Sequence, residues 1–186
     1  MESYKTDKQL YREYLNDNME AFKELVIRHK NNIIYFISRY TKNVDIAEDI
    51  SQDVFMYLLL NKKAYNPKFS LKTFLYTIAK TRAINYLKKE SKIVNIEDYD
   101  SLYIEDKDLE ESIFKRDTQN YVRKVINKMK PDYQAIIYLA DFERLSYKDV
   151  AKVMNKTNGQ TKTLLYNARQ KLKEMLSKEG FVYEEQ

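Results

Sequence analysis

The chain has 186 residues and a net charge of +5, with two glycines, two prolines, one histidine and no cysteine. The lack of cysteine excludes disulfides, thiolate metal sites and thiol catalysis, and a single histidine cannot form a histidine metal cluster. Few glycines and prolines are typical of helical proteins, and the length suits one domain or two small ones. No apolar signal core and no run of ~20 apolar residues is evident, so we expect a cytoplasmic protein without membrane insertion.

Apolar residues recur at helical spacing along the chain, and no convincing strand alternation is present. The pattern predicts an all-α protein with helices over residues 7–15, 18–40, 44–60, 70–89, 109–129, 131–142, 146–155 and 160–178. Asp45 and Glu48 are the expected capping residues of the third helix, and Ser70 is the expected N-cap of the fourth. Gly180 is the expected C-cap of the last helix.

The single histidine falls on the apolar stripe of the second predicted helix, with Phe22, Val26, Ile33, Phe36 and Tyr40. A histidine that acts as a charge switch needs a nearby partner, and the sequence identifies none. We therefore expect His29 to be a packed helix residue and not a catalyst.

The last third of the chain has the pattern of a short helix, a turn and a longer basic helix. Ser146 and Asp149 have the spacing of a capping box, and Asn158-Gly159 supplies the backbone freedom for the chain to reverse. The buried stripe expected on the second helix contains Thr161, Leu165, Ala168 and Leu172. The opposite face carries Lys162, Thr163, Tyr166, Asn167 and Gln170. Amide, hydroxyl and ammonium groups on such a helix are typical of proteins that read the major groove of DNA.

A second basic region, residues 62–92, contains nine Lys and Arg and one acid. A lysine-rich run alone is usually a solvated helix face, but here aromatic residues interleave with the charges: Tyr65, Phe69, Phe74, Tyr76 and Tyr86. Basic groups follow a phosphate backbone, and aromatic faces stack on unpaired bases. We expect half of these rings to belong to the core, and the combination favours contact with DNA.

Charge is unevenly distributed, with a net +5 in residues 1–90, −6 in residues 91–111 and +6 in residues 112–186. Two basic bodies that flank an acidic strip indicate two modules that face one polyanion. We therefore predict two small helical domains, residues 1–90 and 109–186, joined by an acidic linker over residues 91–108. The linker is either a solvated tether or a polyanion that occupies a channel for nucleic acid.

Five segments resemble the bacterial RNA polymerase sigma factors of the extracytoplasmic-function (ECF) type: 45–55 (DIAEDISQDVF), 74–79 (FLYTIA), 82–87 (RAINYL), 145–151 (LSYKDVA) and 159–163 (GQTKT). The first three resemble sigma region 2, and the last two resemble the helix-turn-helix of region 4. The resemblance covers residues 21–176. It implies a non-enzymatic initiation subunit, without a cofactor or metal, that binds core polymerase, melts promoter DNA and recognises the −10 and −35 elements.

The resemblance also implies which residues make the contacts. Melted −10 DNA would be held by Tyr65, Lys68, Phe69, Lys72, Phe74, Lys80, Thr81, Arg82 and Asn85. The −35 duplex would be read by Lys162, Thr163, Tyr166 and Asn167, with Arg169 and Lys171 near phosphates. The clamp helices of core polymerase would bind Asp49, Gln52, Asp53 and Met56. Many family members are held inactive by an anti-sigma factor, which is a further implied partner.

Four positions depart from the family pattern. Phe74 stands where tryptophan is usual, which keeps a ring but loses the indole N–H. Thr81 replaces an asparagine, so we expect an altered −10 base preference. In the recognition helix, Thr161 replaces a valine and Leu164 replaces a commonly basic residue, so we expect fewer −35 contacts.

Two other hypotheses stay open at this point. The first is a helix-turn-helix regulator whose N-terminal helices dimerise and which binds a palindromic operator without polymerase. The second is a helical partner-binding protein whose basic residues are only solvated surface. An enzyme is the least expected class, because no nucleophile, acid–base pair or metal cluster can be assembled from the sequence.

Overall fold

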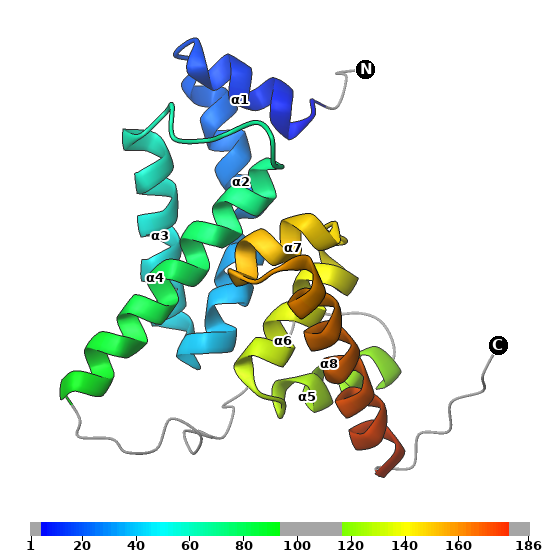
Figure 1. Cartoon of the computed structure of the whole chain (residues 1–186). Coiled ribbons are helices and arrows are strands. Elements are labelled where there is room, and N and C mark those ends of the chain that lie inside the picture. Colours follow the sequence, from blue (N-terminus) through cyan, green and yellow to red (C-terminus); the bar gives the residue numbers. More distant parts are fainter. Residues whose placement is uncertain (1–4, 94–116, 179–186) are drawn as a thin grey trace. The chain divides into compact units, whose positions relative to one another are not determined.

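The computed structural model of the chain describes residues 5–93 and 117–178. The regular elements in these two stretches are all helices, which confirms the predicted all-α class. Contacts divide the chain into two compact units, residues 1–95 and 96–186, and each unit is described by itself (Figure 1). Most of the predicted linker, the beginning of the helix expected from residue 109, and Gly180 lie outside the described residues.

The first unit contains four helices: α1 (Asp7–Leu15), α2 (Met19–Thr41), α3 (Val44–Leu60) and α4 (Leu71–Ile93). The last of these continues beyond residue 89, where the sequence predicted its end. Helix α2 packs against the other three, and α3 also packs against α4 (Figure 1). Their apolar faces bury a common core that includes Leu25, Phe36, Val54, Leu58 and Leu75.

The beginnings of α3 and α4 test the predicted caps. At α3 the cap is Asn43, whose Oδ1 accepts the N–H of Ile46 at 3.1 Å. The prediction that Asp45 and Glu48 cap this helix is therefore wrong, and Asp45 lies inside its first turn, near the positive end of the helix dipole. At α4 the Ser70 Oγ accepts a backbone N–H of the first turn at 3.1 Å, as predicted.

The beginning of α1 is held against α2 by a partly buried ionic cluster. Asp7 Oδ1 accepts a hydrogen bond from Arg28 at 2.8 Å, and Asp7 Oδ2 lies 2.8 Å from His29 Nε2. His29 is 4% exposed, so it is a packed residue as predicted, and Asp7 is the partner that the sequence did not identify. Burial acts to raise the pKa of Asp7, but the hydrogen bonds and charges of His29 and Arg28 hold this pKa below its usual value.

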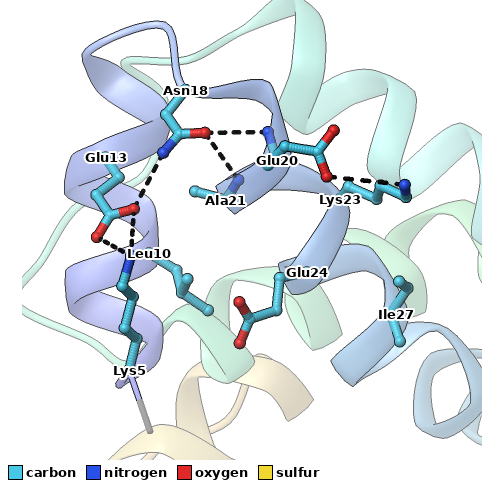
Figure 2. A pocket seen from close by; sticks show the side chains of 9 residues that line it. All are labelled: Lys5, Leu10, Glu13, Asn18, Glu20, Ala21, Lys23, Glu24 and Ile27. Atoms are coloured by element: carbon cyan, nitrogen blue, oxygen red, sulfur yellow. Dashed lines mark hydrogen bonds and ion pairs between the residues drawn. The ribbon is translucent and has the colours of Figure 1, made fainter. Parts of the chain in front are cut away.

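The other end of α1 turns into α2 through a polar corner (Figure 2). Glu13 accepts hydrogen bonds from the Lys5 ammonium at 2.9 Å and from the Asn18 amide at 3.1 Å. The side-chain oxygen Oδ1 of Asn18 in turn accepts hydrogen bonds from the backbone N–H groups of Glu20 and Ala21, in the first turn of α2. Because Asn18 both caps α2 and contacts α1, side-chain hydrogen bonds fix the angle between the two helices.

The second unit contains α5 (Asp117–Asn127), α6 (Pro131–Ile137), a π-helical turn η1 (Tyr138–Phe142), α7 (Tyr147–Met154) and α8 (Asn158–Lys178). Helix α8 packs against α5, α6 and α7 (Figure 1). The core of this unit includes Val125, Ile136, Leu139, Val150 and Leu165. The helix predicted over residues 131–142 is present, but its last five residues have π-helical geometry.

The chain reverses direction between α7 and α8 at Asn155. This residue ends α7 with a φ of 54°, in the left-handed region. Thr157 and Gln160 then form a reciprocal capping box: the Gln160 N–H lies 3.2 Å from the Thr157 hydroxyl, and the Thr157 N–H lies 2.9 Å from Gln160 Oε1. Asn158 and Gly159 lie in the first turn of α8, so the prediction that they form the reversal is wrong.

Candidate nucleic-acid interface

Helix α8 is held by its buried side and turns its polar side outward. Thr161, Leu165 and Ala168 are each at most 2% exposed, whereas Leu172, also predicted in this stripe, is half-buried. All six residues predicted to contact the −35 duplex are exposed: Lys162, Thr163, Tyr166, Asn167, Arg169 and Lys171. The structure therefore places the whole predicted set on the accessible side of one helix.

Four residues of this set form what we call the α8 face: Lys162, Thr163, Tyr166 and Asn167. They occupy two successive turns of the helix, so their side chains are neighbours. Tyr166 is 64% exposed, and the Lys162 ammonium lies 5.9 Å from the centre of the Tyr147 ring on α7. An ammonium, a hydroxyl, a phenol and an amide together can contact both phosphates and base edges.

Arg169 and Lys171, the two basic residues expected near phosphates, each form an ion pair within the protein. Arg169 forms a salt bridge with Asp141 of η1, and the hydrogen bond to that carboxylate raises the pKa of the guanidinium. Lys171 Nζ lies 3.0 Å from Glu174 Oε2. Exposed pairs contribute only ~0–1 kcal/mol, so either cation can exchange its carboxylate for a phosphate. Sequence reasoning missed Asp141, because no local pattern brings residue 141 beside residue 169.

The second candidate surface lies along α4. Phe74, Thr81 and Asn85 recur at i, i+7 and i+11, so they share one side of this helix. Thr81 and Asn85 are exposed, and Phe74 is half-buried. Lys80 and Arg82 precede and follow Thr81 and therefore project to the two edges of this side.

The loop over residues 61–70 continues this surface. Lys68 is exposed, and Lys72, in the first turn of α4, is half-buried. The Tyr65 hydroxyl donates a hydrogen bond to the Phe69 carbonyl at 2.8 Å, which closes the loop. The Tyr65 ring packs edge-on against Phe74, with ring centres 5.6 Å apart. The structure thus brings together the loop and helix residues that the resemblance assigned to melted DNA.

The aromatic residues of this region are less buried than predicted. Tyr76 is 2% exposed and belongs to the core, whereas Tyr65, Phe69, Phe74 and Tyr86 are half-buried. The expectation that half of the five rings belong to the core is therefore wrong. These four rings keep part of their surface accessible to a ligand.

The third candidate surface, which we call the α3 face, is formed by Asp49, Gln52, Asp53 and Met56. All four residues are exposed, as the sequence predicted, and lie opposite the buried stripe of α3. Leu60 lies one turn beyond Met56 and is 73% exposed. Sequence reasoning did not include Leu60, although its i+4 spacing from Met56 was a signal that could have placed it on this face.

One ion pair connects the α3 face with α4. Arg82 Nη1 lies 3.2 Å from Asp53 Oδ2, and the guanidinium lies 5.8 Å from the centre of the Tyr57 ring. A residue assigned to DNA and a residue assigned to polymerase therefore contact each other. No local sequence pattern predicts this contact, because 29 positions separate the two residues.

Within residues 5–93 and 117–178, no group of three or more His, Asp or Glu could hold a metal ion. Across the same two stretches, no helix combines the length and apolar character needed to cross a membrane.

Both units match known families, in the predicted order. Residues 25–93 match the Sigma-70 region 2 family, and residues 119–172 match the Sigma-70 region 4 family. The chain is similar to the ECF RNA polymerase sigma factor SigM of Bacillus subtilis, with 26% identity over 164 residues that cover 83% of this chain and 94% of the relative. The chain belongs to the ECF-type sigma factors.

A second curated relative and two solved structures support the same family for this sigma factor. The RNA polymerase sigma factor YlaC of Bacillus subtilis is 26% identical over 162 residues, covering 86% of this chain and 94% of the relative. The solved structure of the sigma factor RpoE from Bartonella quintana, in complex with the anti-sigma factor NepR, superposes with a TM-score of 0.70 at 25% identity, covering 84% of this chain and 96% of that one. The solved structure of CnrH, at 17% identity and a TM-score of 0.64, shares the fold over 92% of this chain and 97% of its own.

As a sigma factor, the protein binds core RNA polymerase and directs promoter-specific initiation through recognition of −10 and −35 elements. The resemblance drawn from the sequence is therefore confirmed. A stand-alone dimeric regulator is not favoured, because the region 2 match accounts for the helices that this alternative assigns to dimerisation. A partner-binding protein without DNA contact is not favoured either, since the region 4 match covers the helix-turn-helix.

Proposed function

We propose that the three exposed surfaces divide the work of initiation. The α3 face binds the clamp helices of core polymerase, the loop 65–69 with α4 holds the melted −10 strand, and the α8 face reads the −35 duplex. The observation that carries this proposal is that each surface is the accessible side of an element whose opposite side is core. The domains proposed for this division remain residues 1–90 and 109–186, with an acidic linker over residues 91–108.

At the −10 element, we propose that an unstacked base enters beside the Tyr65 and Phe74 rings, while Lys68 and Lys72 approach phosphates. Stacking on such rings contributes ~1–3 kcal/mol per base. The Thr81 hydroxyl donates to a backbone carbonyl one turn earlier at 2.8 Å. Because its proton is engaged, Thr81 offers a base only acceptor lone pairs, and this supports a preference for a base with an exposed amino group.

At the −35 element, we propose that α8 enters the major groove. Asn167 has the two-sided amide that pairs with adenine, and Lys162 suits guanine or a phosphate. Thr163 and Tyr166 would contact the backbone, and Arg169 would exchange Asp141 for a phosphate. These phosphate contacts would position the helix, while the amide and ammonium would discriminate between sequences.

Transcription with reconstituted core polymerase tests this division of work. Run-off transcripts from DNA of the organism that carries the chain, sequenced at their 5′ ends, would define the promoter. The double variant Asp49→Ala/Met56→Ala should lower the affinity for core polymerase by about thirtyfold, as expected when two interface residues that each contribute ~1 kcal/mol are truncated. Glu20→Ala, which removes an exposed acid from α2, should leave this affinity unchanged. Failure of core polymerase to retain the unaltered protein would overturn the proposal.

We further propose that an anti-sigma factor holds this protein inactive, as NepR is bound to RpoE in the solved complex. Such a partner should compete with core polymerase and suppress run-off transcription in the purified system. A bound protein that leaves both unchanged would not be an anti-sigma factor. We place the protein with its polymerase in the cytoplasm, where it contributes binding energy and no catalytic step of its own.

A further inference from the structure

Helix α1 lies outside the region 2 match, which begins at residue 25, yet it contacts the loop that leads to α4. The Tyr11 hydroxyl donates a hydrogen bond to the Lys62 carbonyl at 2.5 Å. The Tyr14 hydroxyl donates to the Leu59 carbonyl at 3.0 Å. The Leu59 carbonyl lies in the last turn of α3, where carbonyl groups lack helical partners, and Lys62 is the second residue of the loop 61–70. Helix α1 therefore closes the end of α3 and fixes the point at which the loop begins.

The rings of α1 continue into the proposed −10 site. Tyr11 packs edge-on against Tyr65 with ring centres 4.8 Å apart, and Tyr65 packs against Phe74 at 5.6 Å. Behind Tyr11, the series extends to Tyr14 at 5.8 Å and from Tyr14 to Phe22 at 4.9 Å. We call these five rings the aromatic series. It connects α1 and α2 with the loop and α4 through direct contacts.

Burial changes along the aromatic series. Tyr14 is fully buried and Tyr11 is 4% exposed, whereas Tyr65 and Phe74 are half-buried. The inner rings cannot stack on a base, so their effect on DNA must act through the outer rings. Burial, with smaller contributions from Tyr14 and Tyr65, raises the pKa of Tyr11 to about 12, and its hydroxyl remains a hydrogen-bond donor at physiological pH.

Three further contacts hold α1 and the beginning of the loop in place. Lys62 Nζ lies 2.5 Å from Asp17 Oδ1, which ties the loop to the turn between α1 and α2. Helix α1 is itself held on α2 by Asp7 at its beginning and by the Glu13–Asn18 corner at its end (Figure 2). The first residues of the loop are thus attached to an element that is fixed at both ends.

We propose that Tyr11 is a positioning residue for promoter melting: it holds the loop 61–70 in the shape that accepts an unpaired base, without touching the DNA. This inference rests on the proposed assignment of Tyr65 and Phe74 to the −10 site. A loop held in its binding shape loses less conformational freedom when it captures a base. A fixed pocket also discriminates between bases, because it cannot adapt to the wrong one.

The test uses holoenzyme reconstituted with the full chain and a promoter randomised over its −10 element. Sequencing of the transcripts measures base selectivity, as the use of the preferred base relative to the other three. Tyr11→Phe removes the hydrogen bond and keeps the ring, so selectivity should fall by about threefold. Tyr11→Leu removes both contacts and should lower selectivity by about tenfold. Affinity for core polymerase and use of the −35 element should not change.

Two controls interpret the result. Ile37→Val shortens a fully buried side chain of α2 and costs stability similar to one hydrogen bond, but Ile37 does not belong to the aromatic series. Phe74→Ala tests the −10 site itself. If Phe74→Ala lowers selectivity and Tyr11→Leu does not, the inference about Tyr11 is wrong while the site stands. If neither variant changes selectivity, the assignment of the site fails. A loss in Ile37→Val equal to that in Tyr11→Phe would also overturn the inference, because selectivity would then follow stability alone.

Discussion

The two proposed DNA-binding surfaces are built in different ways. The α8 face consists of residues from two turns of one helix, held by a buried stripe on the same helix. The proposed −10 site takes its parts from the loop 61–70 and α4, and the loop is held by α1. A surface on one helix forms wherever that helix forms, whereas an assembled surface also depends on contacts between segments far apart in the sequence.

This difference indicates which substitutions should impair each surface. Recognition of the −35 element should respond mainly to the residues that touch DNA. Opening at the −10 element should also respond to residues that never touch it, because they set the shape of the loop. The following predictions test that contrast, from the largest expected effect to the smallest.

Phe74→Ala should lower transcription from a −10-dependent promoter by ten- to about a hundredfold in run-off assays. The variant removes a surface on which a base can stack, worth ~1–3 kcal/mol, and also removes the ring that supports Tyr65. Phe74→Trp, which restores the ring usual in the family, is the matched control and should retain activity. Activity of Phe74→Ala within twofold of the unaltered protein would show that this ring takes no part.

Asn167→Ala should lower transcription by about tenfold, and only from promoters that retain their −35 element. A two-sided amide contact to a base contributes ~1–3 kcal/mol of discrimination. Ser177→Ala, an exposed polar change near the end of the same helix, should have no effect. An equal loss on promoters with and without the −35 element would contradict the assignment of Asn167 to that element.

Asp7→Asn should lower the free energy of unfolding of the first unit by about 1 kcal/mol at pH 7, since it weakens the contacts to Arg28 and His29. The pKa of Asp7 is depressed in the folded state, so its contribution is present above the unfolded value near 4 and is lost as the pH falls through the folded value. The difference between the two proteins should therefore shrink at pH 3. Urea denaturation, monitored by hydrogen exchange in peptides from α1 and α2, measures this difference in the free energy of unfolding.

The Asp7→Asn variant also tests the difference between the proposed −10 site and the α8 face. A loosened α1 should reduce −10 selectivity while leaving −35 recognition unchanged. Glu20→Gln, at an exposed acid of α2, is the control for the loss of one charge. A difference in stability that is as large at pH 3 as at pH 7 would show that ionisation of Asp7 is not involved.

Gly159→Ala should stabilise the second unit by about 0.5 kcal/mol, with −35 recognition unchanged. Gly159 lies in the first turn of α8, and an added Cβ would meet only the Thr157 hydroxyl, at 3.9 Å. Thermal unfolding of the two proteins provides the measurement. A loss of stability would mean that the chain reversal does require glycine at this position.

Much of this architecture could be predicted from the sequence. The apolar spacing gave the helices of the first unit to within a few residues, and one-sided polarity identified the α8 face and the α3 face. These features depend on the periodicity of a single helix, which is written in consecutive residues. The wrong cap and turn assignments were local choices between similar signals, since both Asn43 and Asp45 can cap a helix, and both Asn155 and Asn158 can end one.

Contacts between elements could not be predicted in this way. The pairs Tyr11–Tyr65, Arg82–Asp53 and Arg169–Asp141 join residues that only the tertiary fold brings together. Single-sequence patterns carry no information on which exposed charge meets which. The partner of His29 was missed for the same reason, because Asp7 belongs to another helix.

The salt bridge between Arg169 and Asp141 bears on how the protein searches a chromosome. Any stretch of duplex offers phosphates, and a bare arginine would bind all of them alike. If Arg169 contacts phosphates as proposed, it must first leave a carboxylate, and each random encounter would gain less by at most the ~1 kcal/mol of an exposed pair. A somewhat larger share of the protein would then stay available for polymerase.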